Sequence, residues 1–399
     1  MSPRRRDVAV ILGVVLVVGI ALRTQVAGVG PLIPRMQDAF DLPFLLAGWL
    51  TSIPVVFLGG MAFVGPVVAR IAGTRAAIAW SMVLVIAFAV WRAFAGDAAA
   101  LLLTTLPLGA GIGLAGALIP AAARNLDPGI RGPALGFFAL GLQAGTGGGA
   151  AIAVPLALLL GGWREALLAL TIPLVIGLVI WIVLWRPQGD DRGTAGASIL
   201  PRTTVPLVAV FGLQAFVFHS TLTWLPARLT EVGWSEAGAG ATFGLLNAFA
   251  MGGTLLVAVW CRTFRLRVRM TFLGSFALAA GLALIAVDPD RTIAWACIAG
   301  VAFGMMFPIA ITLPLDYARD SQDALRLTAG TLGLGYLVSS AGSSLSGGLR
   351  DLSGSFVPVF IVLAIIGFLP AIAAVALRRR PPPDNDGGGA DASVSPPFP

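Results

Sequence analysis

The sequence predicts an all-α integral membrane protein in which twelve transmembrane helices form two pseudo-symmetric six-helix bundles. Of the 399 residues, 57% are hydrophobic and only 11% are charged, which is too few polar residues to cover a water-soluble chain of this length. The apolar residues recur in runs of about 20, the length that crosses the hydrocarbon core as a helix. Because these runs are apolar throughout rather than alternating, they fit helices and not barrel strands.

The expected helices follow one another closely, with one long interruption in the middle of the chain. That interruption, 187–203, is polar and charged, and we expect it to be a cytoplasmic linker between an N-terminal bundle, 1–186, and a C-terminal bundle, 204–380. Residues 381–399 are rich in Pro, Gly and Asp, which is typical of a disordered cytoplasmic tail. The twelve expected spans are 8–31, 44–65, 75–95, 98–122, 132–159, 164–185, 204–226, 237–260, 270–287, 291–315, 325–349 and 355–377.

The distribution of arginine predicts the orientation of these spans. All 26 basic residues are arginine: 19 fall in the loops on the side of both termini, 6 in the opposite loops, and Arg23 within a span. Since cytoplasmic loops carry the excess of positive charge, both termini are expected in the cytoplasm, in a multi-pass protein of the inner membrane. The same pattern accounts for the net charge of +7 without a nucleic-acid partner. We expect a monomer in the lipid bilayer, with a small-molecule solute as its partner and with no cofactor or metal.

The two halves of the chain also repeat one another. A shift of 192 residues aligns Pro34 with Pro226 and Arg75 with Arg267. Internal repeats of six helices are typical of secondary transporters, whose substrate site lies between the repeats near the middle of the membrane. A shift of 194 residues aligns three further pairs: Pro120 with Pro314, Gly136 with Gly330 and Gly141 with Gly335.

The loop after the second span, "GPVVARIAGTRAA", resembles the G-x-x-x-D-R-x-G-R-R signature of the major facilitator superfamily. Gly65, Arg70 and Gly73 match that signature, and Arg75 lies next to the remaining basic positions. The resemblance implies a role for these four residues in gating. Ala69 stands where the signature has its aspartate, so the ion pair that this aspartate makes in the superfamily is not expected here.

A narrower resemblance covers nearly all of 20–377. The segments "LRTQVAGVGPLIP", "GALIPAAARN", "GMMFPIAITLPLDYARD" and "SGGLRDLSGSF" are similar to the cyanate and 2-nitroimidazole transporter family. The first helix of that family typically reads L-R-P-x-x-x-x-V-G-P-L-L-P. Here Arg23 fits this pattern, and Thr24 replaces the usual proline.

Arg23 is the charged residue deepest in an apolar run. Its helical neighbours Gly19, Ala27 and Gly30 are small, which is typical of a face packed on other helices or lining a cavity rather than facing lipid. An intramembrane arginine commonly marks a substrate path, and a guanidinium offers a planar fork to carboxylate-like groups. A structural arginine bonded to helix carbonyls is the alternative interpretation.

Other polar residues inside the spans are candidates to line the same cavity. His219 is the only histidine, on a stripe of small and polar residues, and imidazole can donate, accept or titrate near neutral pH. Each candidate could instead be a satisfied core residue or bond a neighbouring helix. The remaining substrate-binding candidates are Gln25, Gln143, Asn247 and Tyr336.

The acidic residues all fall in loops, span ends or tails, so no carboxylate is expected at mid-membrane to balance Arg23. We therefore expect a secondary transporter that moves a small anionic solute by alternating access, with Arg23 as charge anchor. The alternative is an efflux pump for small neutral or heteroaromatic compounds. The stretch "GLQAGTGGGA" favours efflux weakly, since it resembles an exporter signature except for Thr146 in place of proline. The sequence contains no cluster of metal ligands and no nucleophile–base pair of the kind that would indicate an enzyme.

Overall fold

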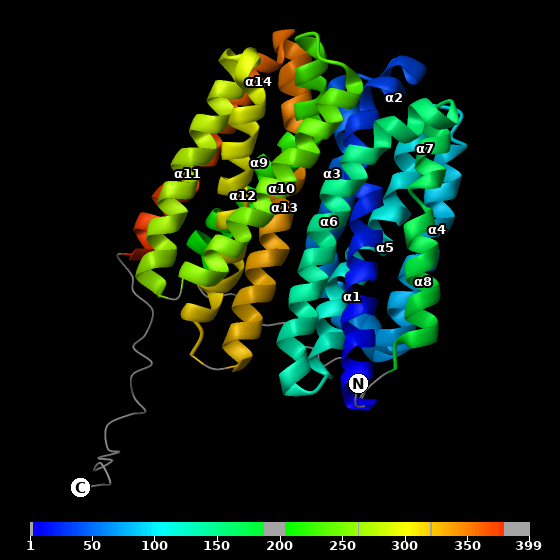
Figure 1. Ribbon diagram of the computed structural model, residues 1–399, viewed down its shortest axis with the longest axis vertical. Helices are drawn as coiled ribbons and strands as arrows, with labels where there is room; N and C mark the ends of the chain where they lie inside the picture. Colours follow the sequence, from blue (N-terminus) through cyan, green and yellow to red (C-terminus); the bar gives the residue numbers. More distant parts are fainter. Residues whose placement is uncertain (1–2, 187–203, 262, 320, 379–399) are drawn as a thin grey trace, which may run out of the picture.

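The computed structural model describes residues 3–186, 204–261, 263–319 and 321–378, and in these ranges the regular structure is helical (Figure 1). The expected linker 187–203 and tail 381–399 lie outside the described residues. The helices of the first half are α1 (Pro3–Ala27), η1 (Gly30–Leu32), α2 (Ile33–Phe40), α3 (Phe44–Ala72), α4 (Thr74–Ala93), α5 (Ala98–Arg124), α6 (Pro128–Leu160), α7 (Trp163–Ala169) and α8 (Ile172–Leu184).

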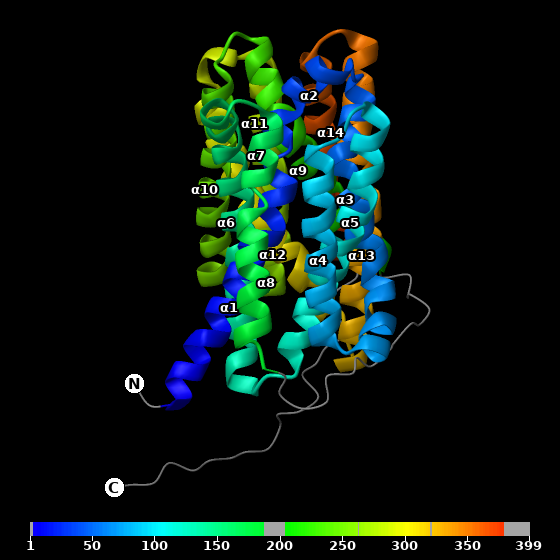
Figure 2. The same ribbon diagram turned by 90° about the vertical axis from the view of Figure 1, so that its right-hand side faces the viewer.

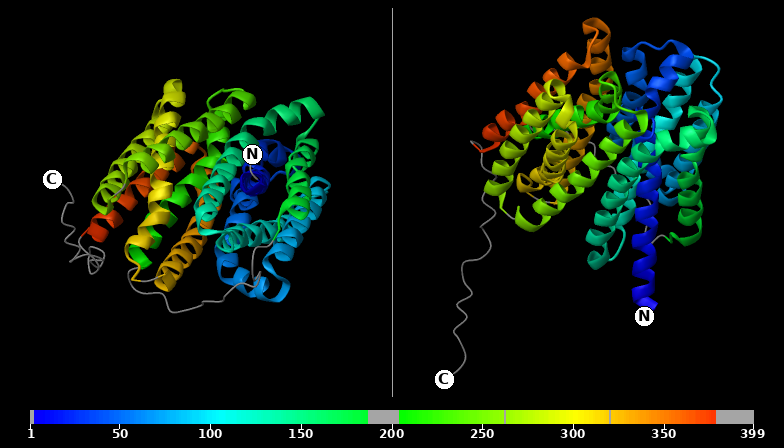
Figure 3. Two further views of the ribbon diagram at one scale, coloured as in Figure 1. Left: turned by 60° about the horizontal axis from the view of Figure 1, so that its bottom comes forward. Right: turned by 45° about the horizontal axis from the view of Figure 1, so that its top comes forward.

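The second half starts again with a long helix and has fewer interruptions. Its helices are α9 (Thr204–Glu231), α10 (Glu236–Trp260), α11 (Phe264–Val287), η2 (Pro289–Arg291), α12 (Thr292–Asp316), α13 (Ser321–Ser353) and α14 (Phe356–Arg378). Seen from below, the first half in blue to green and the second half in green to red lie side by side (Figure 3, left).

Helices occupy all twelve expected spans, which confirms the predicted fold class. Eleven helical segments in the described ranges are long and apolar enough to cross a membrane. The twelfth, α13, is long enough at 33 residues, but its serines and glycines lower its hydropathy. Most helices run a few residues past the expected ends, because polar residues at the membrane surface continue a helix that hydropathy alone would end.

Prolines explain the two places where a span is broken. Pro31 and Pro34 lie in the first turns of η1 and α2, so the first span does not end at residue 31 but turns and continues to Phe40. The sixth span is divided between α7 and α8, and Pro173 lies in the first turn of α8. Proline lacks the backbone N–H that a helix interior needs, and it therefore favours a new start.

Small residues allow the helices to pack closely. Within the first half, Gly141 and Gly145 of α6 leave no room for a side chain against the α1 backbone at Leu16 and Ile20. The two halves meet along two interfaces, α3 with α13 and α6 with α10. In the α3–α13 interface, a Cβ on Gly48 would lie 2.6 Å from the Ser343 carbonyl oxygen.

The bundle has two distinct ends. The end where α1 begins and α14 ends is called here the terminal end, and the opposite end, which carries α2 and the start of α3, the distal end (Figures 1 and 2). This distinction matters because hydrogen bonds between side chains join the two halves at the distal end.

Candidate functional site

The candidate site lies where α1 of the first half meets α9 of the second. Gly30, in η1, packs so closely on α9 that a Cβ there would lie 2.7 Å from the Leu222 carbonyl oxygen. Arg23 lies seven residues earlier, about two helical turns or ~10 Å toward the terminal end. The charge of Arg23 acts electrostatically on His219, one turn before Thr223 on α9. The packing of Gly30 on Leu222 and this electrostatic interaction place Arg23 and His219 in the same part of the molecule, where α1 of the first half meets α9 of the second.

Arg23 lies in the apolar part of α1 with no acidic residue paired to it among the described residues. Its side chain is partly exposed, and among the described residues it makes no hydrogen bond and no ion pair. The residues next to it on α1, Leu22 and Thr24, are buried. A guanidinium keeps its charge at physiological pH and offers five N–H donors. An arginine in this setting can bind an anion that enters the space between the halves.

His219 is 3% exposed and uses only one of its ring nitrogens. Its Nδ1 lies 2.8 Å from the carbonyl oxygen of Ala215, one turn earlier on α9, and 3.5 Å from Oγ of Ser339 on α13. Its Nε2 is buried and has no hydrogen-bond partner among the described residues. Buried polar atoms are nearly always paired, so an unpaired Nε2 beside Arg23 points to a group that the protein itself does not supply.

Tyr336 adds an aromatic wall from α13. Its ring meets the His219 ring edge-on at 6.3 Å and the Phe211 ring edge-on at 5.0 Å between centroids. Its side chain is partly exposed. The structure thus brings together Arg23, His219 and Tyr336, which come from α1, α9 and α13 and lie far apart in the sequence.

Asn247 and Gln143 lie at the interface between α6 and α10 rather than in direct contact with these three residues. A Cβ on Gly147 would lie 3.0 Å from Cβ of Asn247, and Gln143 lies one turn from Gly147 on α6. Nδ2 of Asn247 donates to the Phe243 carbonyl oxygen at 3.2 Å, whereas its Oδ1 is buried without a partner in the described ranges. Since α6 packs on α1 and α10 packs on α9, this pair borders the same group of helices.

The structure places Gln25 away from the other candidates, inside the first half. Its side chain is fully buried. Its Nε2 donates to Oγ1 of Thr171 at 2.8 Å, and its Oε1 accepts from Nη2 of Arg92 at 3.1 Å. Arg92, which sequence reasoning placed in a loop, is 1% exposed in the last turn of α4. Gln25 therefore bonds three helices of one bundle to each other.

A layer of hydroxyl groups closes the space on the distal side of Arg23 and His219. We call it the distal layer, and it comprises Thr51, Ser52, Thr223, Ser343 and Ser344. Oγ1 of Thr51 in α3 lies 2.8 Å from Oγ1 of Thr223 in α9, which in turn lies 2.9 Å from Oγ of Ser343 in α13. Oγ of Ser344 donates to Oγ of Ser52 at 3.0 Å. Sequence reasoning missed this layer, although the serines of α13 recur at helical spacing.

Further contacts join the halves at the distal surface. Asp351, at the end of α13, accepts hydrogen bonds from the backbone N–H groups of Phe44 and Leu45 at 3.0 and 2.8 Å. Arg35 of α2 forms an ion pair with Glu236 of α10 at 2.8 Å. Together with the distal layer, these contacts join the two halves at the distal end, on the distal side of Arg23.

The signature loop lies at the terminal end between α3 and α4. Gly65 packs on α5 beside Ala117 and Leu118, and Gly73 has the left-handed φ of 77° that favours glycine in this turn. Arg70 is exposed in the last turn of α3. Nη2 of Arg75 donates to the Ile182 carbonyl oxygen of α8 at 2.7 Å.

The arginine of the second half that aligns with Arg75 in the repeat forms an ion pair. Arg267, the counterpart of Arg75, pairs with the carboxylate of Asp316. Ala69, at the acidic position of the signature, is 1% exposed and packs in the hydrophobic core of the first half.

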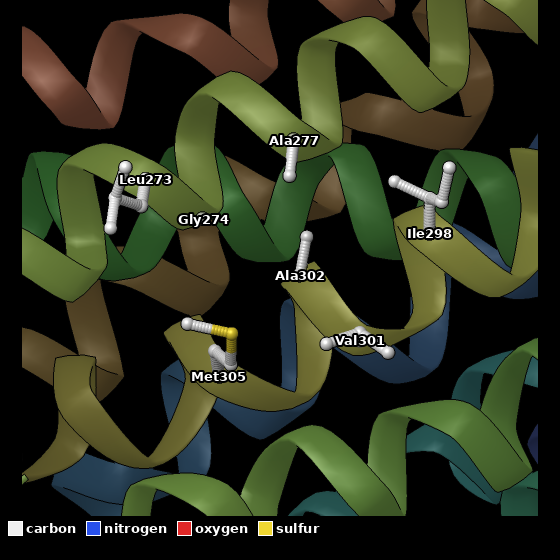
Figure 4. A pocket seen from close by; sticks show the side chains of 7 residues that line it. All are labelled: Leu273, Gly274, Ala277, Ile298, Val301, Ala302 and Met305. Carbon is white, nitrogen blue, oxygen red and sulfur yellow. The ribbon is translucent and has the colours of Figure 1, made fainter. Parts of the chain in front are cut away.

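An apolar hollow between α11 and α12 is not part of this site (Figure 4). Its lining includes Leu273, Ile298 and Met305 and contains no charged or hydrogen-bonding side chain. Leu273 and Ile298 are exposed on the outside of the bundle. Such a surface suits lipid chains rather than a polar solute.

Known proteins match most of this chain. The model of the Major Facilitator Superfamily matches residues 15–346. The cyanate transport protein of Escherichia coli (strain K12) is 27% identical over 369 residues, which cover 89% of this chain and 94% of that protein. The 2-nitroimidazole transporter of the same organism is 26% identical over 376 residues, which cover 93% of this chain and 95% of that protein.

Solved structures show the same fold. A bacterial homolog of the human lysosomal transporter Spinster, in an inward-facing and unoccupied conformation, superposes with a TM-score of 0.77. The sequence identity is 16%, and the alignment covers 95% of this chain and 98% of that one. The similarity to the cyanate and 2-nitroimidazole transporters that the sequence motifs indicated is thus confirmed over most of the chain.

Proposed function

The chain belongs to the Major Facilitator Superfamily, and on that basis we propose that it is a secondary active transporter of a small anionic solute with Arg23 as charge anchor. It is a multi-pass membrane transporter rather than an enzyme. Alternating access between the halves would carry the solute past Arg23. The observation that carries the proposal is a partly exposed guanidinium in the apolar part of α1 that makes no hydrogen bond or ion pair with the described residues.

The energetics of Arg23 support an anionic ligand. A charge in a membrane interior is costly unless it is paired or hydrated. Arg92 and Arg228, which are almost fully buried, bond to acceptors inside the protein, and Arg228 also pairs with Glu231 at 3.0 Å. Arg23 differs from both, because its side chain reaches the space that a solute would enter. An anion there would gain charge-assisted hydrogen bonds, which are stronger than those between neutral groups.

The closed distal layer supports a specific state of the transport cycle. With both termini in the cytoplasm, as the arginine distribution favours, the distal end faces outward and the described conformation is inward-facing. Transport would then require the distal layer to open and the terminal end to close. The orientation can be checked by labelling a single cysteine at exposed Arg291 with a membrane-impermeant reagent in intact cells, and labelling from outside is expected.

The alternative function is efflux of small neutral or heteroaromatic compounds. Aromatic rings around His219 favour it: Phe218 meets His219 at 5.5 Å and Phe303 at 5.3 Å between centroids. The Phe218 ring, which is partly exposed, would stack on a flat neutral compound. If the chain shares the function of the related 2-nitroimidazole transporter, its solute would be a nitroimidazole-like compound.

The test replaces Arg23 in the purified protein and measures uptake of small organic and inorganic anions into proteoliposomes. We expect Arg23→Gln to lower uptake about 10- to 100-fold, because a hydrogen bond to a charged group contributes roughly 1.5–3 kcal/mol. Arg291→Gln, which changes an exposed distal arginine, is the matched control and should leave uptake unchanged. Wild-type anion uptake by a folded Arg23→Gln protein would contradict the role of Arg23 as charge anchor, whereas absence of anion uptake by the wild-type protein would favour the neutral-compound alternative.

A further inference from the structure

The chemical nature of the solute can be narrowed from the hydrogen bonds of His219. Nδ1 of His219 lies 2.8 Å from the Ala215 carbonyl oxygen. A carbonyl oxygen only accepts, so this contact requires the hydrogen on Nδ1. In the neutral imidazole, Nε2 then carries a lone pair and can only accept a hydrogen bond.

The surroundings of His219 favour that neutral form. The ring is 3% exposed, and a buried charge without a partner is unfavourable. The guanidinium of Arg23, which is always charged, lies within electrostatic reach and repels a second positive charge. The other groups around the ring are the neutral Ser339 of α13, the Tyr336 ring and the Phe218 ring. None of them supplies a negative charge.

The site is thus chemically asymmetric across the two halves. The first half presents donors on Arg23, and the second half presents an acceptor on His219 that is buried and unpartnered among the described residues. A solute with only acceptor groups would satisfy Arg23 and leave Nε2 unpaired. A solute that also carries a donor would satisfy both.

We propose that the transported solute is a small anion that also carries an N–H or O–H donor, with its anionic group toward Arg23 and its donor toward Nε2 of His219. This inference rests on the proposed function and narrows it. Anions that contain no hydrogen, such as nitrate or halides, occupy only the Arg23 side and bind more weakly.

The first test reads the protonation of His219 directly. His219 is the only histidine of the chain, so protein labelled with ¹⁵N-histidine gives one imidazole spectrum. In lipid nanodiscs at pH 7 we expect a protonated Nδ1 and an unprotonated Nε2. A proton on Nε2 in the free protein, in either the other tautomer or the imidazolium, would overturn the inference.

The second test compares pyrrole-3-carboxylate with furan-3-carboxylate by calorimetric titration. The two acids share shape and charge and differ by one N–H, which furan replaces with oxygen. A site built around a hydrogen bond discriminates against the analogue that lacks it, and we expect at least tenfold weaker binding of the furan acid to the wild-type protein. His219→Gln, whose carbonyl still accepts, should keep the preference, and His219→Leu should lose it. Monodisperse gel filtration of both variants shows that they fold.

The outcomes separate this inference from the proposed function. Equal binding of the two acids to the wild-type protein overturns the donor requirement while leaving an anionic solute in place. Loss of the preference in His219→Leu but not in His219→Gln supports the inference. Absence of binding by both acids and by a panel of small anions contradicts the proposed function instead.

Discussion

Two arginines inside apolar helices illustrate how the protein handles charge at the scale of single residues. Nη2 of Arg92 donates to Oε1 of Gln25, whose own Nε2 donates to Thr171. The charge is thereby held in a network that is bonded within one half. Arg23 has no such partner among the described residues. The contrast separates a structural arginine from a candidate ligand-binding one.

This contrast yields a stability prediction. Gln25→Leu removes the acceptor for Arg92 and leaves a buried donor unpaired, which costs about 1–3 kcal/mol. We expect a lower apparent Tm in detergent for Gln25→Leu and an unchanged or higher one for Arg23→Gln. The double variant Gln25→Leu with Arg92→Met should recover part of the loss, because replacing both partners by apolar groups is nearly neutral. An unchanged Tm of Gln25→Leu would show that the network adds no stability.

The sequence already contained the reason why Gln25 and Arg23 belong to different environments. Residues two positions apart point to nearly opposite sides of a helix. If Arg23 faces the second half, Gln25 must face its own bundle. The buried position of Arg92 was harder to foresee, because the arginine count treats residues near span ends as loop charges. Only the packing of α4 against α7 and α8 places it inside.

At the scale of elements, α13 supplies the cap that α3 lacks. Pro43, the residue before α3, makes no side-chain hydrogen bond, and the two carboxylate oxygens of Asp351 accept from the N–H groups of Phe44 and Leu45 instead. A carboxylate at a helix N-terminus is favoured both by hydrogen bonding and by the helix dipole. Here the cap comes from the opposite half, so it stabilises the helix only while the distal end is closed.

If the halves move apart distally as proposed, the cap favours the conformation in which the distal end is closed. Asp351→Ala should weaken distal closure by about 0.5–2 kcal/mol. We place spin labels on cysteines introduced at exposed Ala39 and Arg291, one in each half. In Asp351→Ala, we expect the distance between the labels, measured by double electron–electron resonance, to shift toward longer values. Leu352→Ala, a change at the neighbouring residue that is 89% exposed, should leave the distances unchanged. Identical distance distributions in Asp351→Ala and wild type would show that the Asp351 cap does not stabilise distal closure.

Element positions were largely predictable because hydropathy and length determine a membrane span. Contacts such as the Asp351 cap were not, since they join residues about 300 positions apart. The helix break at Pro173 had a visible proline signal, and the expected single span from 164 to 185 overlooked it. The serines of α13 lower its hydropathy, and Ser343 and Ser344 are buried and bond to α9 and α3 rather than face lipid.

For the whole molecule, the distal layer determines which side of the site is closed. Its hydroxyl pairs join α3 to α9 and α13 beside the Arg23–His219 pair. Alternating access requires these bonds to break during each cycle. Breaking these hydrogen bonds costs little free energy, because the separated hydroxyl groups can bond instead to water that enters the open pathway.

A covalent bond across the distal layer should therefore stop transport. Oγ of Ser52 and Oγ of Ser344 lie 3.0 Å apart, so paired cysteines at these positions are close enough for a disulfide after a small adjustment. In a background where Cys261 and Cys297 are serine, we expect the oxidised Ser52→Cys, Ser344→Cys protein to lose solute uptake into proteoliposomes and to regain it with a reductant. Each single cysteine variant, oxidised in the same way, should transport normally. Full uptake by quantitatively cross-linked protein would mean that the distal layer does not open during transport, and the solute would have to pass the site by another route.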